Sequence, residues 1–148
     1  MSYDERMEWY REKFELTSQS GYRHEKNECT INTEEEQLQL RAIADYPIKC
    51  TAKEYYFPGG RSGDLLFIHG GYNVVFVVEV KVTTNSGKKF KRVCEQAQQF
   101  GEALSALYPK YAVYALIYTL EGHTVIGTHR THLNTMPEGV RARFPFKI

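Results

Sequence analysis

Two carboxylates and one amine stand close together in the centre of the chain, in a pattern that suits metal-assisted hydrolysis. Asp64 begins one short apolar run, and Glu79 and Lys81 lie near the end of a second. A Gly-Gly pair at residues 70–71 separates the two runs, which predicts a β-hairpin. A hairpin can place Asp64 beside Glu79. The two carboxylates would then suit a hard divalent cation and an activated water.

The alternation of side chains along the second run sets Glu79 apart from its neighbours. Successive side chains of a strand point to opposite faces, so Glu79 and Lys81 share one face, roughly 7 Å apart along the strand. Apolar residues fill the other face: Val74, Phe76, Val78, Val80 and Val82. A carboxylate beside this much apolar surface is costly unless it is paired, metal-bound or at an open site. The residues alone leave open a plainer arrangement, in which Asp64 is a turn residue and Glu79 pairs with Lys81.

Length and composition indicate one globular domain over residues 1–148, with its core at about residues 33–130. Hydrophobic residues make up 42% of the chain and charged residues 25%, as in ordinary soluble domains. The net charge is only +1, so any nucleic-acid interface must rest on local charge.

The cysteines and the apolar stretches bear on the compartment. The three cysteines form no CxxC pair, which argues against a disulfide framework or a structural zinc site and favours an intracellular setting. The N-terminal residues contain no apolar leader, and the longest apolar stretch, residues 112–118, is too short to span a bilayer. We therefore expect a soluble protein of the cytoplasm or nucleus, without a membrane anchor. Its compactness suits a virus or phage as well as a cell.

Periodicity, turn residues and capping residues predict the order of elements. The expected elements are an amphipathic helix at residues 3–16, a helix at about 33–47, a strand at 50–57, a loop at 58–63, the hairpin of 64–82, a helix at about 88–108, and strands at 111–119 and 124–129. Residues 141–146 show no clear regular structure. The helix between the third and fourth strands predicts a crossover connection within a mixed sheet, and so an α/β fold.

This arrangement resembles the PD-(D/E)XK nuclease superfamily, and is similar in layout to VRR-NUC domains and archaeal Holliday-junction resolvases. The resemblance covers residues 33–120 and rests on Gly63-Asp64 followed by Glu79-Val80-Lys81. Gly63 stands where the superfamily usually has proline. The resemblance implies an αβββαβ restriction-endonuclease-like core, with a central mixed sheet flanked by helices, to which this chain adds an N-terminal helix.

The resemblance also implies roles for individual residues. Asp64, Glu79 and the carbonyl of Val80 would bind Mg²⁺ or Mn²⁺, and Lys81 would orient or deprotonate the attacking water or stabilise the transition state. Many members add an acidic residue from the helix before the first strand. Three glutamates of this chain fall there, and the sequence leaves the choice open: Glu34, Glu35 and Glu36. A QxxxY motif of some branches is matched here by QxxxF, which begins at Gln96.

A basic run precedes and enters the long helix. It consists of Lys88, Lys89, Lys91 and Arg92, and no acidic residue occurs from position 80 to 94. Cations at a helix N-terminus oppose the helix dipole, a placement that is easier to understand if they face phosphates. Arg61 is a second candidate phosphate contact. The alternatives are that the run is a solvated helix start and that Arg61 is plain surface.

Together these features predict an Mg²⁺-dependent endonuclease that hydrolyses phosphodiester bonds in DNA. Selectivity for branched or flapped DNA is implied by the resemblance alone, as is a homodimer, for which Met7, Tyr10 and Phe14 would be interface residues. Three alternatives stay open: cleavage of RNA, an inactive module that binds nucleic acid or a protein partner, and a coincidental motif in an unrelated α/β interaction module.

Overall fold

The structure is a computed structural model, and it describes residues 33–57 and 61–148. The elements along these residues are α2 (Thr33–Ala44), β1 (Ala52–Phe57), β2 (Arg61–His69), β3 (Val74–Val80), α3 (Gly87–Leu107), β4 (Ala112–Thr119), β5 (Gly122–His129), the 3₁₀ helix η2 (Thr131–Leu133) and α4 (Glu138–Arg141). The helix predicted at residues 3–16, with Met7, Tyr10 and Phe14, lies outside the described residues.

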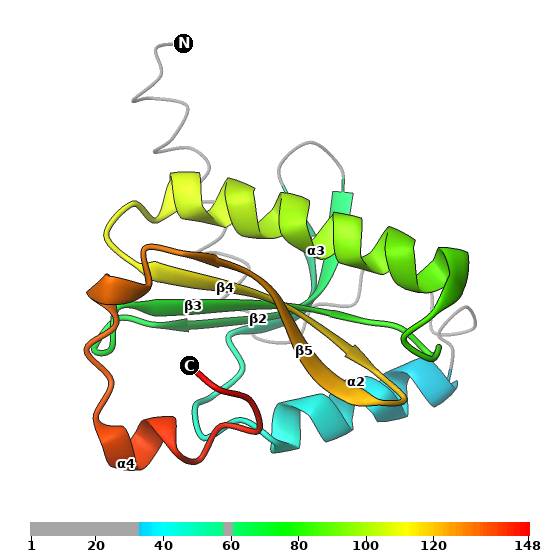
Figure 1. Cartoon of the computed structure of the whole chain (residues 1–148), viewed down its shortest axis with the longest axis horizontal. Coiled ribbons are helices and arrows are strands. Elements are labelled where there is room, and N and C mark those ends of the chain that lie inside the picture. Colours follow the sequence, from blue (N-terminus) through cyan, green and yellow to red (C-terminus); the bar gives the residue numbers. More distant parts are fainter. Residues whose placement is uncertain (1–32, 58–60) are drawn as a thin grey trace, which may run out of the picture.

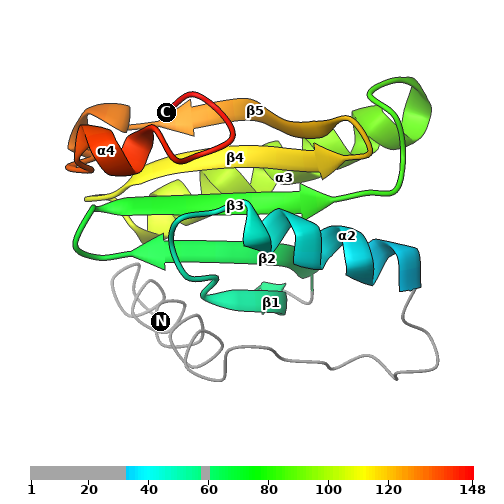
Figure 2. The ribbon, with the colours of Figure 1, turned by 90° about the horizontal axis from the view of Figure 1, so that it is seen from below.

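The strands form one mixed sheet in the order β1-β2-β3-β4-β5 (Figure 1). Neighbouring strands are antiparallel, except that β3 and β4 run parallel. The chain between these two strands contains α3, which crosses one face of the sheet, while α2 and α4 lie on the other face (Figure 2). The predicted crossover and the α/β class with a mixed sheet flanked by helices are therefore confirmed.

Several predicted boundaries were wrong by a few residues. The helix predicted to reach residue 47 ends at Ala44, and α4 includes Arg141, where no regular structure was expected. The largest difference concerns the loop predicted at 58–63. The β1–β2 ladder continues to the Phe57–Arg61 pair, so β2 begins at Arg61. Asp64 consequently lies inside a paired strand and does not begin one.

Apolar side chains cover both faces of the central strands, which explains why every residue of β3 and β4 is buried. On the α2 side, Tyr46 stacks on Phe67 with ring centroids 4.0 Å apart. The even-numbered residues of β3 belong to this cluster, and Val82 packs against it, as the alternation predicted. On the α3 side, Phe100 and Leu104 belong to a cluster with Val75 and Val77. Within the described residues, no helix is long and apolar enough to cross a membrane.

The α3 helix approaches the sheet closely at a glycine. A Cβ atom added at Gly101 would lie 2.8 Å from Cβ of Ala115 on β4, a distance that the two elements cannot tolerate without moving apart. The absence of a side chain at position 101 therefore sets how closely α3 packs on β4.

This contact predicts that Gly101→Val destabilises the protein. The added branched side chain must force α3 away from the sheet, which costs ~1–3 kcal/mol for overpacking. Urea unfolding followed by circular dichroism would measure the change. Gly139→Val is the matched control, because no atom lies within 4 Å of a Cβ built at Gly139. Equal stability of the two variants would contradict this account of the α3–β4 contact.

Candidate active site

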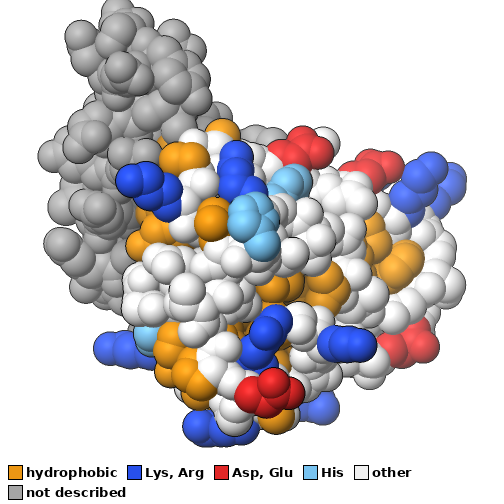
Figure 3. Space-filling view, turned by 60° about the vertical axis from the view of Figure 1, so that its left-hand side comes forward, with side chains coloured by type: hydrophobic (Ala, Val, Ile, Leu, Met, Phe, Trp, Pro, Cys, Tyr) orange, Lys and Arg blue, Asp and Glu red, His pale blue; other side chains and the backbone are white. Residues whose placement is uncertain are grey.

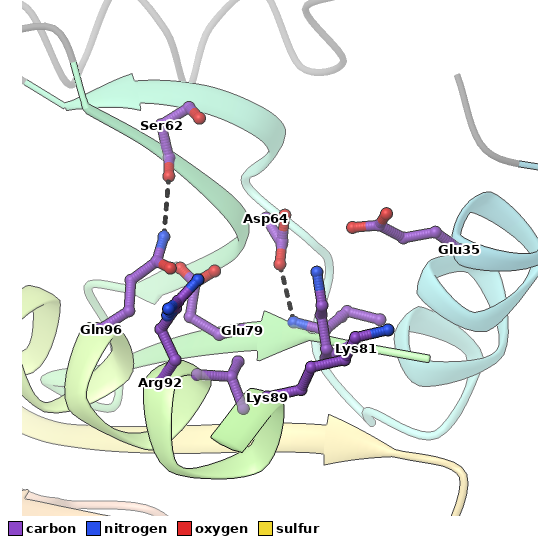
Figure 4. Close-up of a pocket in the computed structure, with 10 residues that line it drawn as sticks. Glu35, Ser62, Asp64, Glu79, Lys81, Lys89, Arg92 and Gln96 are labelled. Carbon is purple, nitrogen blue, oxygen red and sulfur yellow. Dashed lines mark hydrogen bonds between the residues drawn. The ribbon is translucent and has the colours of Figure 1, made fainter. Parts of the chain in front are cut away.

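A polar pocket of about 300 Å³ opens where the carboxyl end of β3 meets β2 and the first turns of α2 and α3 (Figure 4). Its lining residues are Glu35, Ser62, Asp64, Glu79, Val80, Lys81, Lys89, Arg92, Val93 and Gln96. Three carboxylates, two lysines and one arginine are thus gathered around one small space. The pocket contains most of the residues that the sequence singled out.

The β2–β3 hairpin brings Asp64 and Glu79 together. Leu65 pairs with Val78 in the antiparallel ladder, so Asp64 and Glu79 are the next residues along the two strands. Beyond this point the regular pairing stops, and Asp64 Oδ2 accepts a hydrogen bond of 2.7 Å from the backbone N–H of Val80. This bond holds the Asp64 carboxylate against the end of β3.

Glu79 is buried although it carries a carboxyl group. Its exposed fraction is only 2%, because β2, β4 and α3 surround this part of β3. Burial raises the pKa of Glu79 well above its usual range, and the nearby charge of Asp64 and a hydrogen bond between the two carboxyl groups raise it further. The backbone amide of Asp64 opposes this shift, and the charge of Glu35 adds to it. Ionisation of Glu79 is therefore unfavourable while Asp64 is charged.

One oxygen of Glu79 has no hydrogen-bond partner. Its Oε1 atom is buried and accepts no hydrogen bond from any of the described residues. An unsatisfied buried oxygen is unfavourable, by about 1–3 kcal/mol for a typical polar group. A cation bound between Asp64 and Glu79 would satisfy this oxygen and would remove the repulsion between the two carboxylates.

Val80 and Lys81 complete the end of β3. The N–H and C=O groups of one residue in an extended strand project to the same side, so the Val80 carbonyl faces the side on which its amide contacts Asp64. The backbone N–H of Lys81 donates to the carbonyl of Tyr118 at 3.0 Å, which extends the parallel pairing by one residue. The Lys81 side chain is exposed and lines the pocket. Glu79 and Lys81 thus share one site, as expected.

The three candidate glutamates in the first turn of α2 point to different surroundings. Glu35 lines the pocket, and its carboxylate points toward Asp64 in Figure 4. Glu36 faces elsewhere, because its Oε1 accepts a hydrogen bond of 3.4 Å from Nζ of Lys53, whose side chain is 5% exposed. Glu34 is exposed. The structure therefore brings Glu35, and not Glu36, to the carboxylate pair.

Helix α3 presents one stripe of side chains to the pocket. Lys89, Arg92 and Gln96 follow each other at spacings of three and four residues and all line it, whereas Lys88 and Lys91 do not (Figure 4). Gln96 Nε2 donates to the backbone carbonyl of Ser62 at 3.3 Å, so Gln96 also ties α3 to β2.

Half of the basic run lines the pocket and half does not. All four of its side chains are exposed, but only Lys89 and Arg92 reach the pocket. Arg61, the other predicted phosphate contact, belongs to β2, where it pairs with Phe57. Figure 3 brings forward the side of the molecule that carries the β2–β3 turn. Lysine and arginine side chains are dispersed over the described part of that face and form no single patch.

Sequence reasoning missed two pocket residues. Val93 was not among the predicted site residues, and Ser62 fell in the loop predicted at 58–63, but both line the pocket. The spacing of Val93 from Lys89 could have indicated it, because residues four apart share a helix face. Ser62 could not have been found in this way, since its position depends on the extension of the β1–β2 ladder beyond Asp64.

The residues of this pocket could bind a divalent cation, although they do not supply a complete set of protein ligands. Within the described ranges, no group of three or more His, Cys, Asp and Glu side chains is arranged to hold a metal ion. Mg²⁺ does not require such a group, because it commonly binds through one or two carboxylates and keeps several waters. Asp64, Glu79 and the Val80 carbonyl supply oxygen ligands of this kind. The Oε1 atom of Glu79, which has no hydrogen-bond partner within residues 33–57 and 61–148, is the observation that favours a cation here.

No protein-family model, no curated protein and no solved structure matches this chain.

The burial of Glu79 predicts an unusual dependence of stability on pH in metal-free buffer. Because the pKa of Glu79 is raised on folding, the folded chain keeps a proton that the unfolded chain releases. Stability should therefore fall as the pH rises above about 4.3, the ordinary pKa of glutamate, towards the raised pKa. Glu79→Gln should flatten this dependence and should stabilise the metal-free protein at pH 8 by ~0.5–2 kcal/mol, as for the relief of a destabilised functional site.

Thermal unfolding with EDTA across this pH range would test the prediction. Glu102→Gln is the control, because Glu102 is exposed on the same helix that covers Glu79. A Glu79→Gln variant that is less stable than the wild type at pH 8 would show that Glu79 is not a buried and uncompensated carboxyl group.

Proposed function

We propose that this chain is a divalent-metal-dependent endonuclease that hydrolyses phosphodiester bonds in DNA. The observation that carries the proposal is the pair of half-buried Asp64 and buried Glu79. One oxygen of Glu79 has no hydrogen-bond partner among the described residues, and Lys81 lines the same pocket. We further propose that the mixed sheet with its crossover helix is the restriction-endonuclease-like core that the sequence resembles. Branched or flapped DNA is the proposed substrate class, and homodimerisation belongs to the same proposal.

The pocket has the charges that phosphodiester hydrolysis requires. Asp64, Glu79 and the Val80 carbonyl would hold Mg²⁺ or Mn²⁺, with Glu35 within reach from α2. The ion would supply Lewis-acid activation of water and would neutralise charge on the phosphoryl group.

The side chains of the chain itself complete the proposed reaction. Lys81 lines the pocket, where it would orient the attacking water and offset the negative charge that develops on the phosphate. Arg92 can form two parallel hydrogen bonds to phosphate oxygens, and Lys89 adds a point charge beside it. Three cations around three carboxylates suit a small anionic group that must be bound next to a metal ion.

The first prediction from this proposal is loss of cleavage on removal of the acidic and basic pocket groups. Asp64→Ala, Glu79→Ala and Lys81→Ala should each reduce metal-dependent cleavage by ~100-fold or more, because each variant removes a metal ligand or a group that stabilises the transition state. Labelled single-stranded, duplex, flapped and four-way-junction DNA, together with RNA, would be incubated with Mg²⁺ or Mn²⁺ and separated on denaturing gels. Lys110→Ala, which changes an exposed lysine outside the pocket lining, is the control.

Each outcome of this experiment has a definite meaning. Intact cleavage by Asp64→Ala and Lys81→Ala would overturn the proposed site. Cleavage of RNA alone would assign the activity to RNA. A folded wild type that cuts no substrate with either metal would point to the inactive binding module.

A second prediction uses the division of the basic run. The double variants Lys89→Ala/Arg92→Ala and Lys88→Ala/Lys91→Ala remove the same charge from the same helix, but only the first removes groups that line the pocket. The first should lower kcat by ~10–100-fold, as expected for loss of charge stabilisation at the reacting phosphate. The second should leave kcat unchanged, raise KM, and reduce the salt dependence of binding by about one unit of slope per residue.

Steady-state cleavage kinetics at several salt concentrations would separate the two effects. Identical kinetic changes in the two double variants would show that the run acts as one diffuse basic surface, without a specific role for Lys89 and Arg92.

A further inference from the structure

Tyr55 lies on the strand next to Asp64 and packs against the residue that precedes it. It belongs to β1, has an exposed fraction of 0%, and pairs in the ladder with Gly63, the residue before Asp64. A Cβ atom added at Gly63 would lie 2.4 Å from both Cζ and Oη of Tyr55. The hydroxyl end of the tyrosine ring therefore fills the space that a side chain at position 63 would need.

An unusual backbone conformation in β1 places the tyrosine there. Glu54 has φ of 51°, in the left-handed region, where a non-glycine residue is strained by roughly 1–2 kcal/mol. It lies between the Lys53–Leu65 and Tyr55–Gly63 pairs, so the irregular residue is the one opposite Asp64.

The consequence of this irregularity is visible in the packing of β1. Residues three apart in a regular strand point to opposite faces, but Ala52 and Tyr55 belong to the same cluster on the α3 side of the sheet. Tyr55 is thus turned toward the face that carries Asp64 and Glu79. Strained backbone of this kind persists where the surrounding structure demands it, and it is common at functional sites.

The electrostatic environment of Tyr55 agrees with this position. Burial raises the pKa of Tyr55 well above its ordinary value, and the charges of Glu79 and Asp64 raise it further. The phenol is therefore protonated under all ordinary conditions.

We propose that Tyr55 is a positioning residue for the Asp64–Glu79 pair, which it holds in the geometry that binds a divalent cation. The ring and its hydroxyl fill the space beside the backbone of β2 at Gly63, immediately before Asp64. Residues around metal ligands that fix their orientation typically affect metal affinity by about 10–100-fold. This inference rests on the proposed metal-dependent activity.

The test is Tyr55→Phe in the full chain, with Mn²⁺ as the probe. Its half-activating Mn²⁺ concentration for cleavage should rise by ~10–100-fold, and kcat at saturating Mn²⁺ should stay within a few-fold of the wild-type value. Calorimetric titration with Mn²⁺ in the absence of DNA should show the same loss of affinity. A second variant, Gly63→Ala, should weaken Mn²⁺ binding at least as much, because the new Cβ must displace the tyrosine ring.

Tyr46→Phe is the matched control. Tyr46 is also buried, but it belongs to the aromatic cluster on the opposite face of the sheet. A purely structural tyrosine would change the melting temperature without changing the half-activating Mn²⁺ concentration, so the control should leave that concentration unchanged.

The outcomes separate this inference from the proposed function. If the wild type binds and uses Mn²⁺ and Tyr55→Phe has the same half-activating concentration, the positioning role is overturned and the nuclease proposal stands. If the wild type neither binds Mn²⁺ nor cleaves, the proposed function itself fails.

Discussion

The burial of Glu79 beside Asp64 is the constraint on which the arrangement of the site depends. A carboxylate at 2% exposure is unfavourable in a wholly apolar strand, and a second carboxylate next to it makes its ionisation harder. The structure offsets only part of this cost. Asp64 is held by the amide of Val80, but Glu79 keeps a buried oxygen without a partner among the described residues. The remaining cost makes the fold less stable than its apolar core would allow.

The helices around the pocket add charged groups of both signs to this pair. Helix α2 adds a third carboxylate through Glu35, while its neighbour Glu36 neutralises the buried amine of Lys53. Helix α3 adds Lys89 and Arg92, and its Gln96 is tied to the carbonyl of Ser62. Negative charge is thus concentrated at the base of the site and positive charge at its rim. This is the order in which a metal ion and a phosphate would be stacked.

Much of the fold could be predicted because it follows from local patterns. The hairpin and the crossover through α3 derive from periodicity and turn residues. Glu79 and Lys81, predicted to lie near each other, line the same pocket. The structure differs from the prediction where pairing between distant segments determines the conformation. The ladder between β1 and β2 extends beyond Asp64, and this extension brings Ser62 to the pocket.

Local sequence patterns likewise could not predict which glutamate reaches the pocket or that Tyr55 packs against Gly63, beside Asp64. Three successive glutamates in one helical turn look alike in sequence, and only the position of Lys53 on β1 separates Glu36 from Glu35. The sequence also could not explain Gly63, at the position where the resembled superfamily usually has proline. The Tyr55 ring on β1 occupies the space that a side chain at position 63 would need.

The crossover between β3 and β4 has a consequence for how the protein folds. Asp64 and Glu79 lie fifteen positions apart on one hairpin, so they can meet early, while both are still hydrated. The parallel pairing of β3 with β4 closes the long connection that contains α3, and non-local pairing of this kind forms slowly. The loss of water around Glu79 therefore coincides with the docking of α3. The cost of burying the Glu79 carboxyl group is therefore incurred in this late step. It lowers the folding rate as well as the final stability.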